Sequence, residues 1–291
     1  MPRTVSSRVR GAGVSVSTYS TGRAVSVPSV ARTRTERMIV TRVTRGGETR
    51  QPDELIVEEP MTIQLDGTTV STTMRTPGHD FELATGFCFT EGLLAGTPVA
   101  GVRYCANGPA SAREFNDVTV ETGGLAPVPT PRLGTTSSSC GWCGRDQIEA
   151  LIERLAPLPP HEPIAHAVLA DIPERVLGGQ GLFGATGAVH AAAAFDPVGE
   201  VLLTREDVGR HNAVDKVVGA MLLDGRLPAT GLGLFVSGRA SVEMVQKAWA
   251  GGFAALVAVS APTALAVHAA RRAGLTLAGF VRDGAFNLYA S

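Results

Sequence analysis

Strands and helices alternate regularly in the second half of the chain, and this order constrains the fold more than any other feature. The sequence predicts a hairpin from Val189 to Thr204, strands at 232–236, 255–259 and 275–281, and helices at 212–223, 242–250 and 263–273. Strands that are joined by helices run parallel, because only a long crossover brings the chain back to the same edge. We therefore expect a sheet covered by helices on both faces, with any ligand at the carboxyl ends of its strands.

The first half differs, because its predicted strands are short and several follow one another directly. Strands are expected at 38–40, 61–65, 69–74, 102–104 and 118–120. The turn Asp66-Gly67 between the second and third of them is a strong hairpin signal. Apolar residues on one face of 80–93 predict a helix. This half is therefore expected to be α+β.

Composition divides the chain into four predicted parts. Residues 1–36 contain six arginines in a background of serine, valine and threonine, which predicts a disordered extension. Residues 37–126 form the smaller α+β subdomain. Residues 127–145 are rich in proline and then in small polar residues, which predicts a mobile loop. Residues 146–291 form the α/β subdomain, which is expected to bind a cofactor.

Length, charge and hydropathy exclude several classes of protein. The chain has 291 residues, 44% of them hydrophobic, which is enough for a substantial core. A net charge of -1 gives no overall attraction to nucleic acid or to a membrane, and the longest apolar stretch, 253–259, is too short to span a bilayer. Four cysteines in a chain of this length do not make a disulfide framework, which favours a cytoplasmic location.

Cys140 and Cys143 form a C-x-x-C pair at the end of the predicted 127–145 loop. An apolar stripe at 148–155 predicts that a helix follows directly. The positive end of that helix and the nearby Arg145 favour the thiolate, which is the reactive form of cysteine. In a flexible loop such a pair can react, whereas in a metal knuckle or a disulfide it would not.

Three polar turns that contain glycine are expected at one edge of the sheet. They span 204–212, 237–241 and 280–285 and carry Arg210, Arg239 and Arg282. Backbone N–H groups at helix starts and guanidinium groups bind phosphate, so the three turns together predict an anionic ligand. The alternative is that Asp207 and Ser241 cap helices and that the arginines are solvated.

Two histidines also have more than one interpretation. His211 and Asp215 lie one helical turn apart beside Lys216. They form either an acid–base pair or a histidine satisfied by a local carboxylate, and the sequence favours neither. His190, alone at a strand start, is interpreted as structural. Among the remaining cysteines, Cys88 is expected in the core, and Cys105 has no assigned role.

Several motifs resemble those of the FdhD family, the sulfur carrier accessory proteins of formate dehydrogenase. They are Ser-Ser-Cys-Gly-Trp-Cys-Gly at 138–144, Glu-Asp-Val-Gly-Arg-His-Asn-Ala-Val-Asp-Lys at 206–216, and Ser-Gly-Arg at 237–239 followed by Glu-Met-Val-Gln-Lys at 243–247. Shorter stretches at 52–60 and 86–92 are similar too. The likeness runs from about residue 37 to the C-terminus, and the arginine-rich extension lies outside it.

The resemblance implies a sulfur relay. Such proteins take persulfide sulfur from a cysteine desulfurase and pass it to the molybdenum cofactor, in its bis(molybdopterin guanine dinucleotide) form, for formate dehydrogenase. The resemblance also implies a homodimer, a sulfurtransferase activity and a cytidine-deaminase-like three-layer α/β/α fold in the C-terminal region.

By matching position, Cys140 would carry the persulfide and Cys143 would assist. The residues expected to bind the guanine dinucleotide are Phe280, Val281, Arg282, Asp283, Gly284 and Ala285, together with Asp207, Arg210, His211, Ser237, Gly238 and Arg239 of the other two turns. No resident metal is expected, because Ala192 stands where a zinc deaminase has its general-base glutamate after His190, and no Pro-Cys-x-x-Cys follows.

Three rival functions stay open on sequence grounds. A thiol–disulfide oxidoreductase would place the cysteines in a compact thioredoxin-like unit, but a proline-rich loop precedes them. A structural zinc protein needs a second pair of ligands, and Cys88 and Cys105 are not spaced as one. A cofactor chaperone without sulfur chemistry would keep the arginine turns and not need the thiols.

Overall fold

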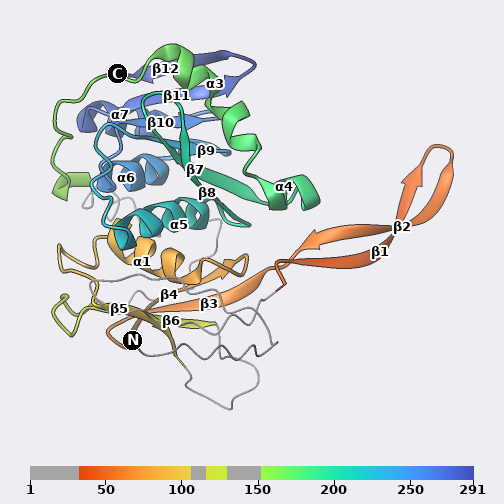
Figure 1. The fold of residues 1–291 in the computed structure, drawn as a ribbon, viewed down its shortest axis with the longest axis horizontal. Helices are drawn as coiled ribbons and strands as arrows, with labels where there is room; N and C mark the ends of the chain where they lie inside the picture. The colour runs from red at the N-terminus through yellow and green to blue at the C-terminus, as the bar shows by residue number, and fades with distance from the viewer. Residues whose placement is uncertain (1–32, 106–115, 130–151) are drawn as a thin grey trace, which may run out of the picture. The chain divides into compact units, whose positions relative to one another are not determined.

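The computed structural model describes residues 33–105, 116–129 and 152–291, and Thr33–Ser291 form one compact unit (Figure 1). This unit contains a six-stranded sheet, a four-stranded sheet and a separate two-stranded hairpin. Residues 1–32 of the predicted extension and most of the predicted 127–145 loop lie outside the described residues. The predicted division into subdomains therefore stays a prediction.

The six-stranded sheet has the order β12-β11-β10-β9-β7-β8. Its strands are β7 (His190–Phe195), β8 (Val201–Asp207), β9 (Gly233–Val236), β10 (Ala255–Ala258), β11 (Thr276–Arg282) and β12 (Ala285–Ala290). The strands β9, β10 and β11 are parallel, as the helices between them predict. The strands β7, β8 and β12 pair antiparallel with their neighbours, so the sheet is mixed.

The edge strand β12 has no counterpart in the sequence prediction. Asp283 and Gly284 both adopt positive φ, at 51° and 71°, and they separate the paired residues Arg282 and Ala285. Two such residues make the turn whose twist matches a hairpin. The Asp-Gly pair was available as a hairpin signal, but the sequence interpretation treated it as part of a ligand turn.

Helices cover both faces of this sheet, as predicted. On one face α5 (Arg210–Leu223), α6 (Val242–Ala250) and α7 (Ala264–Ala273) bury an apolar cluster that includes Val217 and Val245. On the other face α3 (His166–Leu177) packs Leu169 and Ile172 against Phe235. A proline at 173 lies inside α3, which weakened the helical pattern in the sequence.

The four-stranded sheet has the order β4-β3-β6-β5. Its strands are β3 (Glu59–Leu65), β4 (Thr68–Arg75), β5 (Gly101–Tyr104) and β6 (Asp117–Glu121), and α1 (Asp80–Thr90) packs against it. Figure 1 shows α1 between this sheet and α5. The two helices approach closely, because a Cβ on Gly86 would lie 1.9 Å from the carbonyl oxygen of Asp215.

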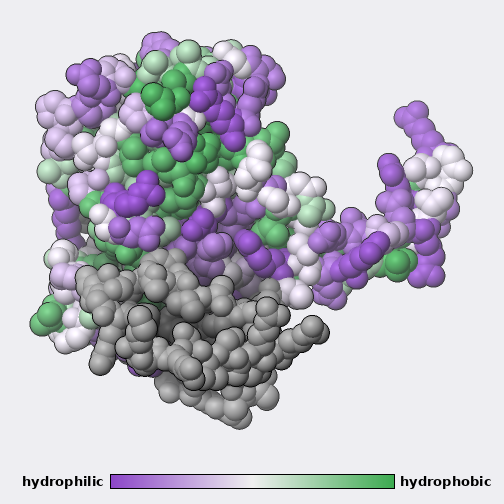
Figure 2. Space-filling view, viewed as in Figure 1, coloured by the Kyte–Doolittle hydropathy of each residue, from purple (hydrophilic) through white to green (hydrophobic). Residues whose placement is uncertain are grey.

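The strands β1 (Thr35–Thr44) and β2 (Gly47–Ile56) form a hairpin that extends away from both sheets (Figure 1). Its surface is mostly hydrophilic, although Ile39 and Val43 are exposed (Figure 2). The sequence predicted only 38–40 as a strand, because the second strand, Gly-Glu-Thr-Arg-Gln-Pro-Asp-Glu-Leu-Ile, lacks apolar alternation. Within the described ranges, no helix is long and apolar enough to cross a bilayer.

Candidate functional site

A cavity of about 670 Å³ opens at the edge of the six-stranded sheet where a ligand was predicted. It lies at the carboxyl ends of β9, β10 and β11 and at the amino end of β7. The lining residues are Pro173, Glu174, Leu177, Gln180, Phe183, Gly187, Ala188, Val189, His190, Val208, Phe235, Ser237, Val259, Val281, Arg282 and Asp283. Most of this wall is apolar, and a few polar groups converge on it, which is the usual character of a small-molecule site.

Ser237 and His190 form the polar floor of the cavity. The Ser237 Oγ accepts a hydrogen bond from the Ala191 N–H at 3.0 Å and lies 3.4 Å from His190 Nδ1. Partial burial lowers the pKa of His190, and the positive charge of Arg210 lowers it further. His190 is therefore neutral at pH 7 and offers the cavity a hydrogen-bonding ring instead of a cation.

The 280–285 turn contributes only its middle to the cavity. Val281, Arg282 and Asp283 line it, whereas Phe280, Gly284 and Ala285 are not among the lining residues. Phe280 comes just before the turn. Its φ of 56° leaves it 38% exposed, which explains why it stays outside the cavity lining.

Of the other two predicted turns, too, only some residues line the cavity. Ser237 lines the cavity directly. Gly238 lies behind it, since a Cβ there would meet the His190 ring at 3.6 Å and the Arg210 side chain at 3.8 Å. Arg239 is exposed and outside the cavity wall. The structure thus brings Arg282 to the cavity and Arg210 beside it, and it does not bring Arg239.

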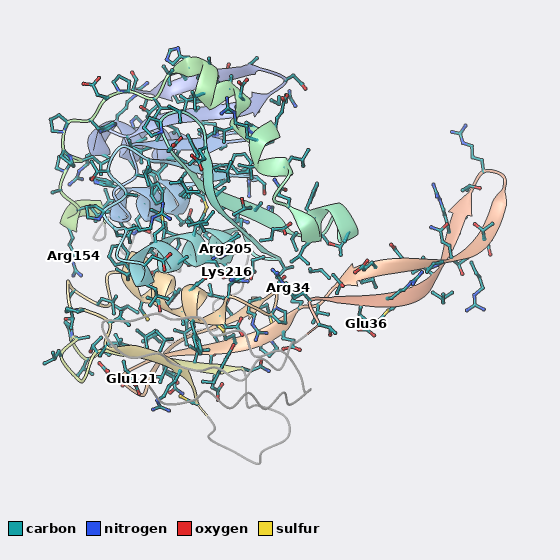
Figure 3. The ribbon with its side chains drawn as sticks, in the orientation of Figure 1. Arg34, Glu36, Glu121, Arg154, Arg205 and Lys216 are labelled. Carbon is teal, nitrogen blue, oxygen red and sulfur yellow. The ribbon has the colours of Figure 1, made fainter. Side chains whose placement is uncertain are left out.

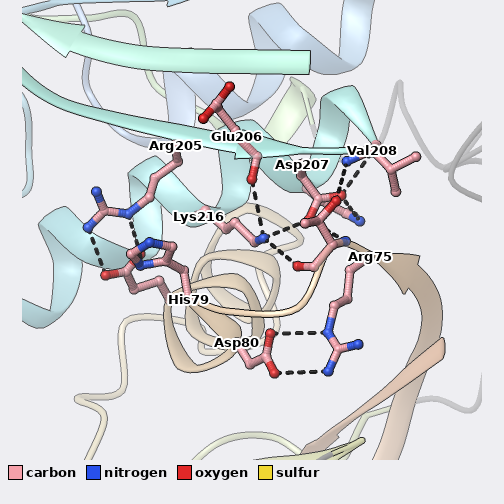
Figure 4. Close-up of polar contacts among 12 residues, drawn as sticks. Arg75, His79, Asp80, Arg205, Glu206, Asp207, Val208 and Lys216 are labelled. Atoms are coloured by element: carbon pink, nitrogen blue, oxygen red, sulfur yellow. Dashed lines mark hydrogen bonds and ion pairs between the residues drawn. The ribbon is translucent and has the colours of Figure 1, made fainter. Parts of the chain in front are cut away.

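Asp207 is fully buried and holds the start of α5 together. Its carboxylate lies 2.7 Å from Lys216 Nζ and accepts hydrogen bonds from the backbone N–H of Thr76 and Gly209 and from the Asn212 side chain. Figure 4 shows these contacts around Lys216. A carboxylate so fully bonded has no position left for a phosphate or a base, so Asp207 has a structural role. It is not the helix cap that the alternative expected, because the N-cap of α5 is Gly209.

His211 and Asp215 do not form the acid–base pair that the sequence allowed. The Asp215 carboxylate accepts hydrogen bonds from Lys247 Nζ at 2.9 and 3.0 Å and from Thr90 Oγ1 at 2.8 Å. His211 is buried, and it is not among the residues that line the cavity. Asp215 therefore serves the packing of α1, α5 and α6.

Further charged groups join α1 to a strand of each sheet, β4 on one side and β8 on the other. Arg75 donates to both carboxylate oxygens of Asp80, at 3.1 and 3.0 Å (Figure 4). Arg205 on β8 pairs with Glu82 of α1, and Figure 3 shows Arg205 and Lys216 in the main body of the molecule and Glu36 on the hairpin. The pairs that Arg75 and Arg205 make with α1 lie between layers of the fold and outside the cavity lining, so they stabilise the structure that holds the site.

Two of the four cysteines can be placed. Cys88 is fully buried, as predicted, and burial raises its thiol pKa, so it is unreactive. Cys105 is also buried, with its Sγ 3.7 Å from Gln64 Oε1. Cys140 and Cys143 lie outside the described residues. Within the residues that the structure describes, no three His, Cys, Asp or Glu side chains gather to hold a metal ion.

The sequence interpretation missed part of the cavity wall. It gives His190 a structural role and assigns no role to Leu177 or Phe183, and all three residues line the cavity. A signal was present in residues 178–187, Gly-Gly-Gln-Gly-Leu-Phe-Gly-Ala-Thr-Gly, because a glycine-rich stretch before a strand is typical of a backbone that borders a ligand.

Comparison with known proteins gives one consistent result. A model of the FdhD/NarQ family matches residues 56–291. The chain is 45% identical to the sulfur carrier protein FdhD of Mycolicibacterium paratuberculosis over 88% of this chain and 96% of that protein. It is 44% identical to the sulfur carrier protein FdhD of Streptomyces coelicolor over 88% of this chain and 94% of that protein.

A solved structure has the same fold. It belongs to a protein of Desulfotalea psychrophila that was assigned as a formate dehydrogenase accessory protein. The TM-score is 0.72 at 23% identity, and the match covers 89% of this chain and 98% of the other.

Proposed function

This chain belongs to the FdhD/NarQ family, and we propose that it accepts persulfide sulfur from a cysteine desulfurase and delivers it to a molybdenum cofactor for formate dehydrogenase. The family's sulfur carriers supply the sulfur-transfer role and the link to formate dehydrogenase. The parts that we add to this role are the desulfurase donor, the persulfide and the molybdenum-bis(molybdopterin guanine dinucleotide) acceptor.

The sulfur step is assigned to Cys140 and Cys143. The Cys140 thiolate attacks the outer sulfur of the donor's persulfide, the donor's sulfur–sulfur bond breaks, and the donor cysteine leaves as a thiolate. Cys140 then carries the persulfide. When Cys143 attacks the inner sulfur, sulfide leaves toward the cofactor, and the resulting disulfide is reduced by a cellular dithiol. The buried Cys88 offers no comparable thiolate.

The observation that carries the cofactor part of the proposal is the cavity at the carboxyl edge of β9, β10 and β11. Its apolar wall suits a planar base, and Arg282 can bond a pyrophosphate through charge-assisted hydrogen bonds. Ser237 and the neutral His190 supply further hydrogen-bonding groups. We therefore place the guanine nucleotide end of the cofactor in this cavity.

Three further parts of the proposal follow the family likeness. We expect a homodimer, a cytoplasmic location and the classification as a sulfurtransferase, with no role for nucleic acid or a membrane. We also infer the cytidine-deaminase-like arrangement, which is supported by the mixed sheet with helices on both faces. Light scattering of the purified protein tests the dimer.

Mass spectrometry tests the sulfur step. The protein is incubated with a cysteine desulfurase and cysteine, and the Cys140–Cys143 peptide should gain one sulfur. The Cys140→Ala variant should not gain it, and a Cys105→Ala variant should load as the parent does. Sulfur found only on Cys88 or Cys105 would contradict the proposal, and a Cys140–Cys143 disulfide that forms to the same extent without the desulfurase would favour an oxidoreductase.

Thermal shift with GDP tests the cofactor part. A ligand that binds the native state raises the melting temperature in proportion to the logarithm of its concentration. GDP should therefore raise the melting temperature, and ribose should not. If millimolar GDP gives no shift, the proposal that the nucleotide binds in this cavity is wrong. The sulfur step would then depend only on the mass spectrometry result.

A further inference from the structure

The short helix α4 (Gly181–Thr186) forms one wall of the cavity, and burial in the core does not fix it there. None of its residues is buried. It lies within residues 178–187, which contain five glycines. Glycine backbones are costly to order, and segments with few buried apolar contacts open at low free energy. The position of α4 therefore depends on a small number of bonds and on its contact with β2.

Glu206 supplies two of those bonds. Its carboxylate accepts a hydrogen bond from the Leu182 N–H at 3.0 Å and another from the Phe183 N–H at 2.8 Å. Glu206 is itself 7% exposed, at the end of β8. In Figure 4 its carboxylate points away from the cluster around Lys216. Lys216 Nζ donates a hydrogen bond to the backbone carbonyl oxygen of Glu206, at 3.4 Å, and not to the carboxylate. The carboxylate is therefore available to hold α4.

Phe183 is the aromatic side chain that α4 brings to the cavity. It lines the wall and is nevertheless 42% exposed. Val208, Phe235 and Val259 line the cavity as well, so a flat ring that enters it meets apolar surface. Such a ring would also cover the exposed part of Phe183, which favours stacking in the bound state.

We propose that α4 is a cover for the cavity, that Phe183 stacks on the planar base of the bound nucleotide, and that Glu206 positions Phe183 by holding the backbone of α4. This inference rests on the proposed nucleotide site and adds the residues that make it selective for a base over a bare phosphate. Phe183 touches the ligand, and Glu206 acts through Phe183.

The first test compares a ligand with a ring and a ligand without one. Phe183→Ala should weaken GDP binding about tenfold in calorimetry, the usual effect of removing an aromatic partner from a base. Binding of inorganic pyrophosphate should not change. Leu288→Ala is the matched control, because Leu288 is 41% exposed and lies outside the cavity lining.

A second variant reports stacking directly. Phe183→Trp should bind GDP as the parent does, and GDP should quench the new fluorescence beyond the change seen in the parent, whose own tryptophans are Trp142 and Trp249. Adding Glu206→Ala should reduce this quenching and weaken GDP binding, with pyrophosphate binding kept. Glu206→Gln should fall between, because an amide retains one acceptor oxygen.

The outcomes separate this inference from the proposed function. If the parent binds GDP and Phe183→Ala binds it equally well, the cover is wrong and the nucleotide site stands. If Phe183→Ala weakens GDP and pyrophosphate alike, the ring does not stack on Phe183, and the inference is again overturned. If the parent binds no GDP, both fail, while sulfur loading of Cys140 still tests the carrier role.

Discussion

Arg205 donates hydrogen bonds to both carboxylate oxygens of Glu82, at 2.5 and 2.9 Å, and so joins β8 of the six-stranded sheet to α1. The Glu82 side chain is 4% exposed, and His79 Nδ1 lies 3.1 Å from the same carboxylate. Burial alone raises the pKa of Glu82, but the bonds from Arg205 and His79 outweigh it and lower the pKa from 4.5 to about 2.

We expect this carboxylate to make stability depend on acid. A group whose pKa is lower in the folded state stabilises the fold above its unfolded pKa, and the stabilisation is lost as the pH falls through the folded value. The window therefore runs from about pH 5 down to about pH 2. The shift corresponds to about 3 kcal/mol of unfolding free energy.

Urea unfolding of Glu82→Gln at pH 7 and pH 3 checks this. The variant should lose about 2–3 kcal/mol at pH 7 and much less at pH 3, where the carboxyl of the unfolded parent already holds a proton. Asp171→Asn is the control, because Asp171 pairs with Arg175 on the exposed surface and such pairs contribute little. Equal losses at both pH values would show that Glu82 acts by shape alone.

Gly86 and Gly219 should tolerate no side chain. A Cβ at Gly86 would lie 1.9 Å from the Asp215 carbonyl oxygen, and one at Gly219 would lie 1.8 Å from the Glu82 carbonyl oxygen. Backbone atoms cannot swing aside, so either alanine substitution should cost about 3 kcal/mol or more. In thermal denaturation, Gly178→Ala should stay near the parent, because nothing lies within 4 Å of its Cβ position.

The parallel strands of the second half and the helices that connect them could be predicted, because each carries its own period. The predicted helix at 242–250 agrees with α6 at both ends, and the strand at 255–259 exceeds β10 by one residue. The helix α3 and the strand β2 were missed for local reasons, since Pro173 and Pro52 interrupt their patterns. Contacts with other segments hold both in place, since α3 packs on the six-stranded sheet and β2 pairs with β1.

The candidate site was predicted less well than the fold, for a physical reason. Strand ends locate the edge of a sheet, so Ser237 and Arg282 could be placed at one edge from sequence alone. Whether a charge at that edge faces the ligand or the core depends on tertiary contacts. Asp207 is paired with Lys216 inside the protein, and no pattern in the sequence distinguishes it from a ligand residue.

Arg282 and Arg239 should differ in their effect on nucleotide binding. Arg282 lines the cavity, and Arg239 is exposed outside it. Removing a charge-assisted hydrogen bond to a phosphate costs about 1.5–3 kcal/mol, so Arg282→Ala should weaken GDP binding at least about tenfold in calorimetry. Arg239→Ala should change it less than about twofold. The reverse ranking would place the phosphates at the 237–241 turn.

In the buried contact of α6 with α5 and α1, removal of the Lys247 charge should reduce the free energy of unfolding more than removal of any other charge. Its ammonium bonds Asp215 and also lies 3.2 Å from Glu91. Burial lowers the pKa of Lys247, but the two carboxylates raise it by more than burial lowers it. The net pKa lies above its ordinary value, so Lys247 is charged at pH 7. Lys247→Met leaves an unpaired buried charge, which should cost about 3–5 kcal/mol.

The pH dependence of that variant identifies the charge responsible. Burial already raises the pKa of Asp215 to about 6, and removing Lys247 raises it further, so in Lys247→Met the carboxyl takes a proton at pH 5 and is no longer a buried anion. Urea unfolding should therefore show a smaller loss at pH 5 than at pH 7, and the double variant Lys247→Met, Asp215→Asn should regain part of the stability at pH 7. Arg103→Met, which removes only the exposed pair with Glu121, should cost under about 1 kcal/mol at either pH. A loss for Lys247→Met that is the same at both pH values would mean that lost packing, and not the stranded carboxylate, sets the cost.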